Sequence, residues 1–164
     1  MFKIGHSKDV HSFVEGRKLI LGGIEIPYKM GLLGHSDADC LLHAITEAII
    51  GALGFGDIGT FFPDNDPKYK DISSRYFLEE AAKMLEMNNF AICNIDSTIY
   101  LEEPMIKPFS HLMKTNIANI LKIDESLVNI KATRGEGLGY IGRKEGVAAE
   151  AVVLIQSTQK IKKL

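Results

Sequence analysis

The sequence predicts an α+β fold in a single domain, with helices layered on one face of a mixed sheet. Its 164 residues suit one compact domain with its own core. Strand-like and helix-like segments are interspersed along the chain, without a repeat or a linker between them. The strand expected at 147–155 is apolar on both faces, and one layer of helices would cover only one of them. We therefore expect a homo-oligomer in which the sheets of neighbouring subunits pack together.

The first elements follow from local patterns. A strand is expected over residues 2–10, and a β-hairpin over 18–26, where a Gly-Gly pair separates two short apolar runs. A helix is expected over 41–53, because apolar residues recur there at helical spacing. Either Asp37 or Asp39 is expected to cap its start.

The rest of the chain alternates turns with regular elements. Residues 57–70 are rich in Pro, Asp and Asn and are expected to form turns without a regular element. Residues 135–142 form a glycine-dense loop. The domain is expected to span residues 1–157, followed by a tail at 158–164. The remaining elements are expected in the order helix 74–87, strand 90–101, helix 108–121, strand 128–133 and strand 147–155.

Composition excludes several classes of protein. The formal net charge of -2 argues against nucleic acid as a partner, since nucleic-acid binding usually needs a basic surface. The most apolar window, 48–55, is far shorter than a membrane span, and no targeting segment is visible. Cys40 and Cys93 stand far apart and are expected to be buried free thiols. We expect a cytoplasmic protein with no membrane partner.

A metal site is suggested by Asp9-Val10-His11. Residues two apart on a strand point to the same side, so Asp9 and His11 can offer ligands to one ion. His43, near the start of the expected helix, is the candidate third ligand, and an ordinary surface or core histidine is the simpler interpretation of it. Two histidines, one carboxylate and an open position are a catalytic zinc pattern. Glu47, one helical turn later, is expected to reach the other ring nitrogen of His43.

Three further segments suggest phosphate and hydroxyl recognition. Residues 34–39 place a glycine, a histidine and a serine just before a helix N-terminus, which favours an anion. The acidic loop at 57–66 suits hydroxyl groups or a hard cation. The glycines after Arg134 let the backbone approach phosphate, and Glu136 can hold a magnesium ion there. A helix cap and an acidic turn are the simpler interpretations of the first two segments.

Together these segments resemble the 2-C-methyl-D-erythritol 2,4-cyclodiphosphate synthase family. Residues 5–11 are similar to its N-terminal G-x-G-x-D-x-H element, and residues 33–44 to its H-S-D-x-D-x-x-x-H-A element. Residues 56–64 contain its G-D-I-G and F-P-D motifs, and residues 131–146 its C-terminal signature. The resemblance covers residues 2 to about 156 in one register.

The resemblance implies a lyase or cyclase of non-mevalonate isoprenoid precursor biosynthesis. It would convert 4-diphosphocytidyl-2-C-methyl-D-erythritol 2-phosphate to 2-C-methyl-D-erythritol 2,4-cyclodiphosphate and release CMP. It also implies a homotrimer that packs its sheets inward, with active sites between subunits. A central cavity, near Arg143, would be able to hold an isoprenoid diphosphate. A zinc phosphohydrolase and a trimer that binds a diphosphate without catalysis are the alternative interpretations.

The resemblance also implies which residues form the site. Zinc would bind Asp9, His11 and His43, and magnesium or manganese would bind Glu136. The substrate-binding residues would be Asp9, His11, His35, Ser36, Asp57, Ile58, Gly59, Phe62, Pro63, Asp64, Asn65, Asp66, Leu101, Glu102, Glu103, Pro104, Met105, Ile106, Lys107, Thr133, Arg134, Gly135, Glu136, Tyr140 and Arg143.

The sequence departs from the family pattern at three places. Ser7 stands where the family has glycine, and Met105 where it has lysine. The family's run of threonines is reduced to Thr133, followed by Arg134. We expect Thr133 to keep the hydroxyl role and Arg134 to contact the α- or β-phosphate. With His35, these two residues are the expected catalytic residues.

Overall fold

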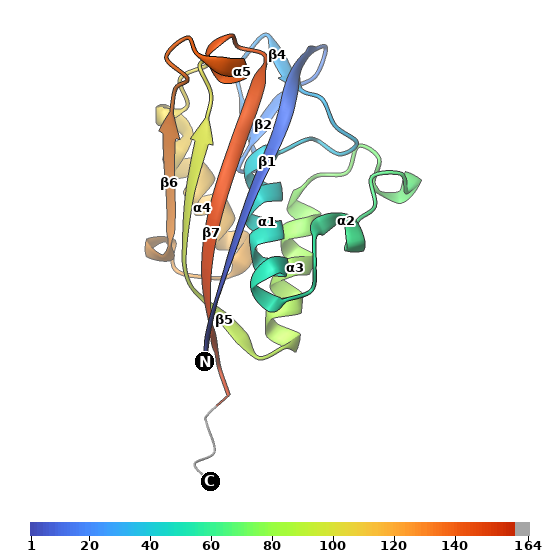
Figure 1. Cartoon of the computed structure of the whole chain (residues 1–164), viewed down its shortest axis with the longest axis vertical. Helices are drawn as coiled ribbons and strands as arrows, with labels where there is room; N and C mark the ends of the chain where they lie inside the picture. Colours follow the sequence, from blue (N-terminus) through green and yellow to red (C-terminus); the bar gives the residue numbers. More distant parts are fainter. Residues whose placement is uncertain (160–164) are drawn as a thin grey trace.

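The computed structural model describes residues 1–159, in which a five-stranded mixed sheet is covered on one face by three long helices (Figure 1). The strand order is β4-β1-β7-β5-β6, in which β5 and β6 are parallel and the other neighbours are antiparallel. The fold class expected from the sequence is therefore confirmed. The strands are β1 (Phe2–Glu15), β4 (Met30–Leu32), β5 (Phe90–Tyr100), β6 (Val128–Thr133) and β7 (Gly146–Ser157), and the long helices are α1 (Cys40–Leu53), α3 (Arg75–Met87) and α4 (Ser110–Leu121).

The expected hairpin is present as a separate two-stranded sheet of β2 (Leu19–Leu21) and β3 (Ile24–Ile26). Its two turn residues, Gly22 and Gly23, have φ values of 60° and 74°. Two successive positive φ values define the turn type that matches the twist of a hairpin, and glycine adopts them without steric cost.

Short helical turns are the main difference from the expected elements. The segment 57–70, expected to be irregular, contains the one-turn helix α2 (Ile58–Phe61), and the glycine-dense loop contains α5 (Gly139–Gly142). The carboxylate of Asp57 accepts hydrogen bonds from Thr60 N at 2.8 Å and Thr60 Oγ1 at 2.9 Å, which stabilises the first of these turns. The remaining short turns are η1 (Pro67–Tyr69), η2 (Lys107–Phe109) and η3 (Glu125–Leu127).

Asp39, and not Asp37, caps the N-terminus of α1. Its carboxylate accepts from Leu42 N at 3.0 Å, and also from Gly22 N at 3.0 Å and Gly23 N at 2.5 Å in the hairpin turn. Burial raises the pKa of Asp39 to about 6, while these backbone N–H groups favour its ionised form. One buried carboxylate thus joins the hairpin to the start of the helix.

A glycine allows α1 to lie directly on β1. A Cβ atom added at Gly5 would lie 1.8 Å from the backbone oxygen of Ala48 and 2.7 Å from the nitrogen of Ala52. Only a residue without a side chain fits between strand and helix at this distance. The close contact sets the position of α1, and with it that of His43.

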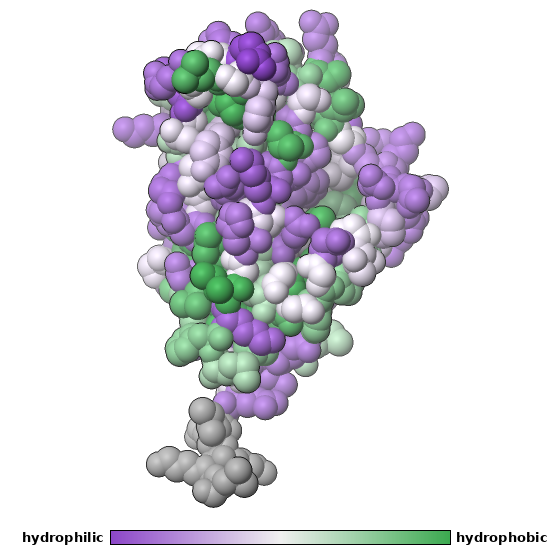
Figure 2. Space-filling view, viewed as in Figure 1, coloured by the Kyte–Doolittle hydropathy of each residue, from purple (hydrophilic) through white to green (hydrophobic). Residues whose placement is uncertain are grey.

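The other face of the sheet is uncovered in a single chain. Figure 2 views this face and shows apolar residues in its lower part and polar residues in its middle. Phe2 and Ile4 of β1 are about two-thirds exposed, and Ile4 pairs with Leu154 of β7. In the middle, Lys8 pairs with Glu150 at 3.2 Å, so β7 is less uniformly apolar than expected.

Three further expectations concern the C-terminal tail, the two cysteines and membrane-spanning helices. Of the expected tail at 158–164, residues 160–164 lie outside the described residues. Cys40 is buried as expected, but Cys93 is only half-buried because it lies at a register irregularity between β5 and β7; both are free thiols. Among the described residues, no helix is long and apolar enough to cross a membrane.

Candidate metal centre and phosphate site

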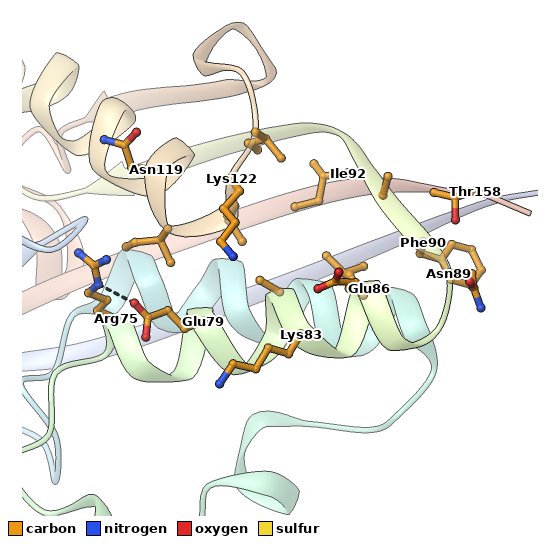
Figure 3. A pocket seen from close by; sticks show the side chains of 16 residues that line it. Arg75, Glu79, Lys83, Glu86, Asn89, Phe90, Ile92, Asn119, Lys122 and Thr158 are labelled. Carbon is orange, nitrogen blue, oxygen red and sulfur yellow. Dashed lines mark hydrogen bonds and ion pairs between the residues drawn. The ribbon is translucent and has the colours of Figure 1, made fainter.

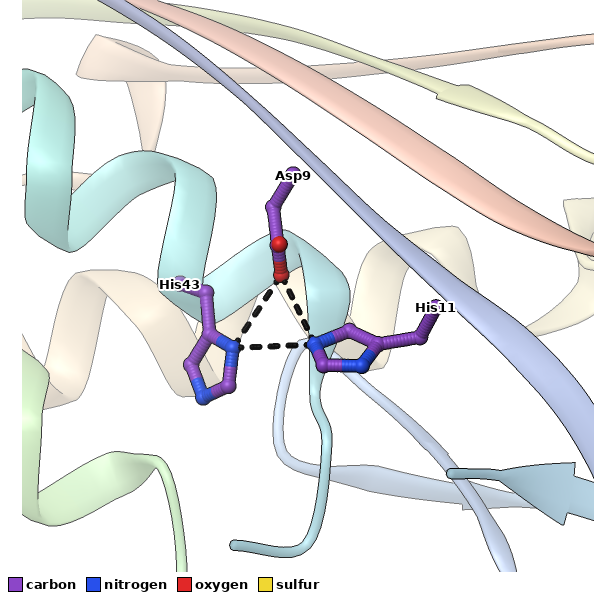
Figure 4. A group of neighbouring side chains, drawn as sticks. All are labelled: Asp9, His11 and His43. Carbon is purple, nitrogen blue, oxygen red and sulfur yellow. Dashed lines mark hydrogen bonds and ion pairs between the residues drawn. The ribbon is translucent and has the colours of Figure 1, made fainter. Parts of the chain in front are cut away.

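Three side chains from two elements converge at one point. Asp9 and His11 project from β1 and His43 from the first turn of α1 (Figure 4). Asp9 Oδ2 lies 3.0 Å from His11 Nε2 and 3.1 Å from His43 Nδ1, and these two nitrogens are 3.3 Å apart. The structure therefore brings together the three residues that the sequence suggested as metal ligands.

The protonation of His11 follows from its second contact. Its Nδ1 lies 2.7 Å from the backbone oxygen of Leu33, which can only accept a hydrogen bond. The proton of the neutral ring is therefore on Nδ1, and the lone pair of Nε2 points at Asp9. Metal-binding histidines usually have such a backbone or carboxylate partner on the second nitrogen.

Asp9 and His11 shift each other's pKa. Burial disfavours the charged forms of both Asp9 and His11, but their mutual contact outweighs it. The pKa of Asp9 is held well below its usual range, and the pKa of His11 is raised. Two imidazole nitrogens and one carboxylate oxygen, all within 4.8 Å of one another, form a donor set that fits a catalytic metal ion with an open position. This is a candidate metal site.

The prediction that Glu47 contacts the His43 ring is wrong. Glu47 does not reach the ring; it accepts a hydrogen bond from the hydroxyl of Ser7 instead. The Nε2 atom of His43 lies 2.8 Å from Ser74 Oγ and 3.2 Å from Ser36 Oγ. Ser7, one of the departures from the family pattern, thus holds the carboxylate that helical spacing had assigned to His43.

The loop before α1 forms one wall beside the cluster. Arg17 supports it from behind by donating to the backbone oxygens of Gly34, at 2.9 Å, and Ser36. The hydroxyl oxygen of Ser36 accepts from Ala38 N at 3.1 Å and also lies 3.2 Å from His43 Nε2 and 3.4 Å from Ser74 Oγ. His35 Nε2 donates to the backbone oxygen of Asp66 at 3.0 Å and so joins this loop to the acidic loop.

A cavity of about 590 Å³ joins the metal cluster to these loops. Asp57 and Asp66 do not line it: Asp57 is exposed at the start of α2, and the carboxylate of Asp66 accepts from Lys68 N. Two aromatic residues that the sequence did not suggest, Tyr69 and Phe77, close its far side. The expected residues that do line it are Asp9, His11, His35, Ser36, His43, Ile58, Gly59, Phe62, Pro63, Asp64 and Asn65.

A second cavity, of about 200 Å³, gathers most of the other expected residues near the end of β6, although Gly135 and Tyr140 do not line it. Glu103 is not among its lining residues and pairs with Lys144 at 2.5 Å. Arg143 pairs with Glu145, while Glu136 is exposed in the loop with a φ of 51°. The lining residues that the sequence suggested are Leu101, Glu102, Pro104, Met105, Ile106, Lys107, Thr133 and Arg134.

Thr133 and the metal cluster lie on opposite faces of the sheet. Thr133 pairs with Tyr100, and the hydroxyl of Tyr100 donates to Glu150 on the uncovered face. Paired residues point to the same side, so Thr133 belongs to the uncovered face. Asp9 alternates with Lys8 along β1 and points to the helical face. One chain therefore does not bring Thr133 to the metal cluster.

A larger cavity, of about 750 Å³, lies away from the metal cluster and the second cavity, between α3 and the end of α4 (Figure 3). Its charged residues include Arg75 and Glu79, which form an ion pair at 2.7 Å, and Lys83, Glu86 and Lys122. Its lining contains no histidine or cysteine. This groove therefore lacks the convergent ligands of the site at β1 and α1.

An α+β domain in which a candidate metal-ligand cluster lies beside a loop at a helix N-terminus has the features of metal-dependent enzymes that act on phosphate groups. Comparison with known proteins identifies the group within this class. The model of the YgbB family matches residues 2–156, and the chain belongs to this family of 2-C-methyl-D-erythritol 2,4-cyclodiphosphate synthases.

Curated relatives match over nearly their whole length. The chain is 60% identical over 155 residues to the 2-C-methyl-D-erythritol 2,4-cyclodiphosphate synthase of Caldicellulosiruptor bescii, covering 94% of this chain and 99% of the relative. It is 54% identical to the synthase of Listeria monocytogenes, covering 95% and 99%.

Solved structures share the fold. The bifunctional IspDF of Campylobacter jejuni superposes with a TM-score of 0.92 at 43% identity; the match covers 96% of this chain and 42% of that longer one. A CDP complex of IspF from Plasmodium falciparum superposes with a TM-score of 0.85 at 34% identity, covering 96% and 97%.

Proposed function

We propose that this chain converts 4-diphosphocytidyl-2-C-methyl-D-erythritol 2-phosphate to 2-C-methyl-D-erythritol 2,4-cyclodiphosphate and CMP, in the non-mevalonate route to isoprenoid precursors. The observation that carries the proposal is the cluster of Asp9, His11 and His43, which opens into the cavity beside the His35–Ser36 loop. Two free thiols, Cys40 and Cys93, agree with a cytoplasmic location for this reaction.

The reaction needs positioning more than base catalysis. The nucleophile is an oxygen of the 2-phosphate, which is already anionic, and it attacks the β-phosphorus while CMP leaves. Ser36 has a hydroxyl proton to donate to that phosphate, and the loop with Gly59 and Phe62 borders the space for the erythritol carbons. Asp9, His11 and His43 would hold zinc, which supplies positive charge to the phosphate oxygens when bound.

The cytidine diphosphate part would bind at the second cavity. Glu136 offers one exposed carboxylate, which suits magnesium or manganese bound mainly by substrate phosphates. A relative has been solved as a CDP complex, which supports a nucleotide site in this fold. Thr133 and Arg134 line the same cavity and would donate to the diphosphate oxygens.

A homotrimer would complete the site. Thr133 and Asp9 lie on opposite faces of the sheet. The metal cluster of one subunit would therefore meet the cavity around Thr133 of a neighbouring subunit. The uncovered face, with Phe2 and Ile4 exposed, would pack inward against the other sheets. Arg143, at the end of α5, would then lie near a central cavity able to hold an isoprenoid diphosphate.

The activity is tested by incubating the purified chain with the cytidine diphosphate substrate, zinc and magnesium. Phosphorus NMR and chromatography should show CMP and a cyclic diphosphate in equal amounts. Release of inorganic phosphate instead would indicate a phosphohydrolase, and binding without turnover would indicate a capture protein. Either result would overturn the proposal.

Shared sites are tested by mixing two inactive variants. His43→Ala removes a proposed metal ligand, and Glu136→Ala removes the carboxylate proposed for the cytidine diphosphate site. If the sites lie between subunits, trimers reassembled from both variants contain some sites with both residues intact and regain part of the activity. No recovery in mixed trimers of confirmed mass, or a fully active monomer, would contradict the shared site.

A further inference from the structure

We propose that Ser74, oriented by Asp37, is a positioning residue that holds His43 in the tautomer whose Nδ1 binds the metal. The inference concerns the site of the proposed function and rests on it for the role of His43 as a ligand. Ser74 is the residue immediately before α3 and is fully buried. It lies close to the His43 ring although it is 31 positions later in the sequence.

The direction of each hydrogen bond follows from the number of protons available. The hydroxyl of Ser74 contacts an oxygen of Asp37, and the Ser74 backbone N–H also donates to this carboxylate at 3.1 Å. An ionised carboxylate only accepts, so the single hydroxyl proton of Ser74 is directed to Asp37. The oxygen of Ser74 then has only lone pairs for His43 Nε2, which lies 2.8 Å away.

The Nε2 atom of His43 must therefore carry a proton. In the neutral ring this leaves the lone pair on Nδ1, the atom that lies 3.1 Å from Asp9 Oδ2 and faces the metal cluster. Ser36 Oγ is a second and longer acceptor, at 3.2 Å, but it already accepts from Ala38 N. The hydrogen bonds from Ser74 to Asp37 and from His43 to Ser74 thus keep a proton on the His43 nitrogen that faces away from the cluster. The backbone oxygen of Leu33 has the same effect on His11.

Helix capping does not account for Ser74. A serine at this position normally accepts a hydrogen bond from an N–H in the first turn of its helix. Here the side chain makes no such bond, and the residue itself has helical φ and ψ angles of -61° and -14°. Its hydroxyl is committed to Asp37 and His43. Loss of the hydroxyl is therefore expected to affect the metal ligand rather than the start of α3.

Asp37 gives the arrangement a second consequence. It belongs to the loop that contains His35 and Ser36, and its backbone N–H donates to Ile72 O at 3.0 Å, close to the start of α3. Asp37 thus joins the loop to the start of α3 in two ways, through its backbone N–H to Ile72 and through its carboxylate to Ser74. The position of the loop and the orientation of His43 therefore both depend on this residue.

The test compares Ser74→Ala and Asp37→Asn with the control Ser73→Ala, whose side chain is exposed at the adjacent position. Zinc affinity is measured by competition with a chelator, and the ring protons of His43 are followed by NMR in the zinc-loaded chain. Ser74→Ala should weaken zinc binding by about 10- to 100-fold. It should also lose the exchange-protected Nε2–H signal of His43, while the chain stays folded. Asp37→Asn should give a smaller loss of affinity, and Ser73→Ala none.

Two results would overturn the proposal. The first is zinc affinity within twofold of the parent in Ser74→Ala, or in Asp37→Asn if Ser74→Ala does not fold. The second is a loss of affinity that Ser73→Ala shows equally. Both measurements are made without substrate. They therefore test the role of Ser74 independently of whether the chain releases CMP.

Discussion

The contact between Gly5 and α1 predicts how strongly the metal site depends on the packing of one strand against one helix. In Gly5→Ala the new Cβ atom would lie 1.8 Å from Ala48 O, whereas side-chain carbons essentially never approach closer than 3.0 Å. The obstructing atoms belong to the helix backbone, so no rotation of a side chain can relieve the contact. The helix must move away from β1.

The size of the effect follows from this geometry. Forcing extra volume into a packed core commonly costs 1–3 kcal/mol, and a clash with backbone belongs at the upper end, at about 3 kcal/mol. For a chain of this length that corresponds to a fall in unfolding temperature of about 6–12 °C. His43 is carried by α1, while Asp9 and His11 are carried by β1. Metal sites tolerate ligand shifts of only about 0.2 Å, so zinc affinity should fall on the order of tenfold or more.

A matched control lies in the same helix. Gly51 has open space around its Cβ position and lies in the last turn of α1. Gly51→Ala should stabilise the chain by about 1 kcal/mol, because alanine favours helix over glycine, and should leave zinc affinity unchanged. Thermal unfolding at equal protein concentration and chelator competition measure both effects. An unfolding temperature of Gly5→Ala at or above that of the parent would show that α1 does not have to move away from β1.

Three other substitutions test separate parts of the structure. His43→Ala leaves two ligands and should drop zinc content well below one ion per chain by elemental analysis; unchanged zinc would remove His43 from the site. Asp39→Ala leaves three backbone N–H groups without their acceptor and should destabilise the chain by about 2–4 kcal/mol in denaturant unfolding, and an unchanged midpoint would contradict the capping role. Arg134→Ala should lower turnover by about ten- to a thousandfold without loss of zinc. Turnover and substrate affinity equal to the parent would show that Arg134 is not involved.

Local periodicity accounts for the parts of the site that could be predicted. Asp9 and His11 were expected to act together because residues two apart on a strand share a side, and β1 does extend through both. The hairpin around Gly22 and Gly23 followed from turn chemistry in the same way. Such features depend on neighbours within a few residues, which the sequence shows directly.

The partner of His43 shows where local spacing fails. Glu47 lies one turn after His43 on the same helix, and spacing alone favours their contact. In the folded chain Ser7, on the facing strand, donates to Glu47, and Ser74 reaches His43 from another helix. Contacts between residues far apart in the chain depend on how the elements pack, and no sequence spacing encodes them.

The short helices α2 and α5 were missed for a different reason. Each has four residues, which is too short for an apolar periodicity to appear. The first is stabilised by the cap at Asp57, a contact that a sequence rich in turn residues does not distinguish from an ordinary turn.

By itself, the sequence determined the α+β class, the long helices and strands, and the placement of Asp9 and His11 on one side of β1, because each rests on residue type and short-range spacing. The tertiary structure confirmed that His43 meets Asp9 and His11, and it alone decided that Ser74 rather than Glu47 contacts the His43 ring and that Thr133 faces away from the cluster. The physical reason is that these contacts depend on how closely the strands and helices pack. That distance is set by contacts between elements, such as the one at Gly5.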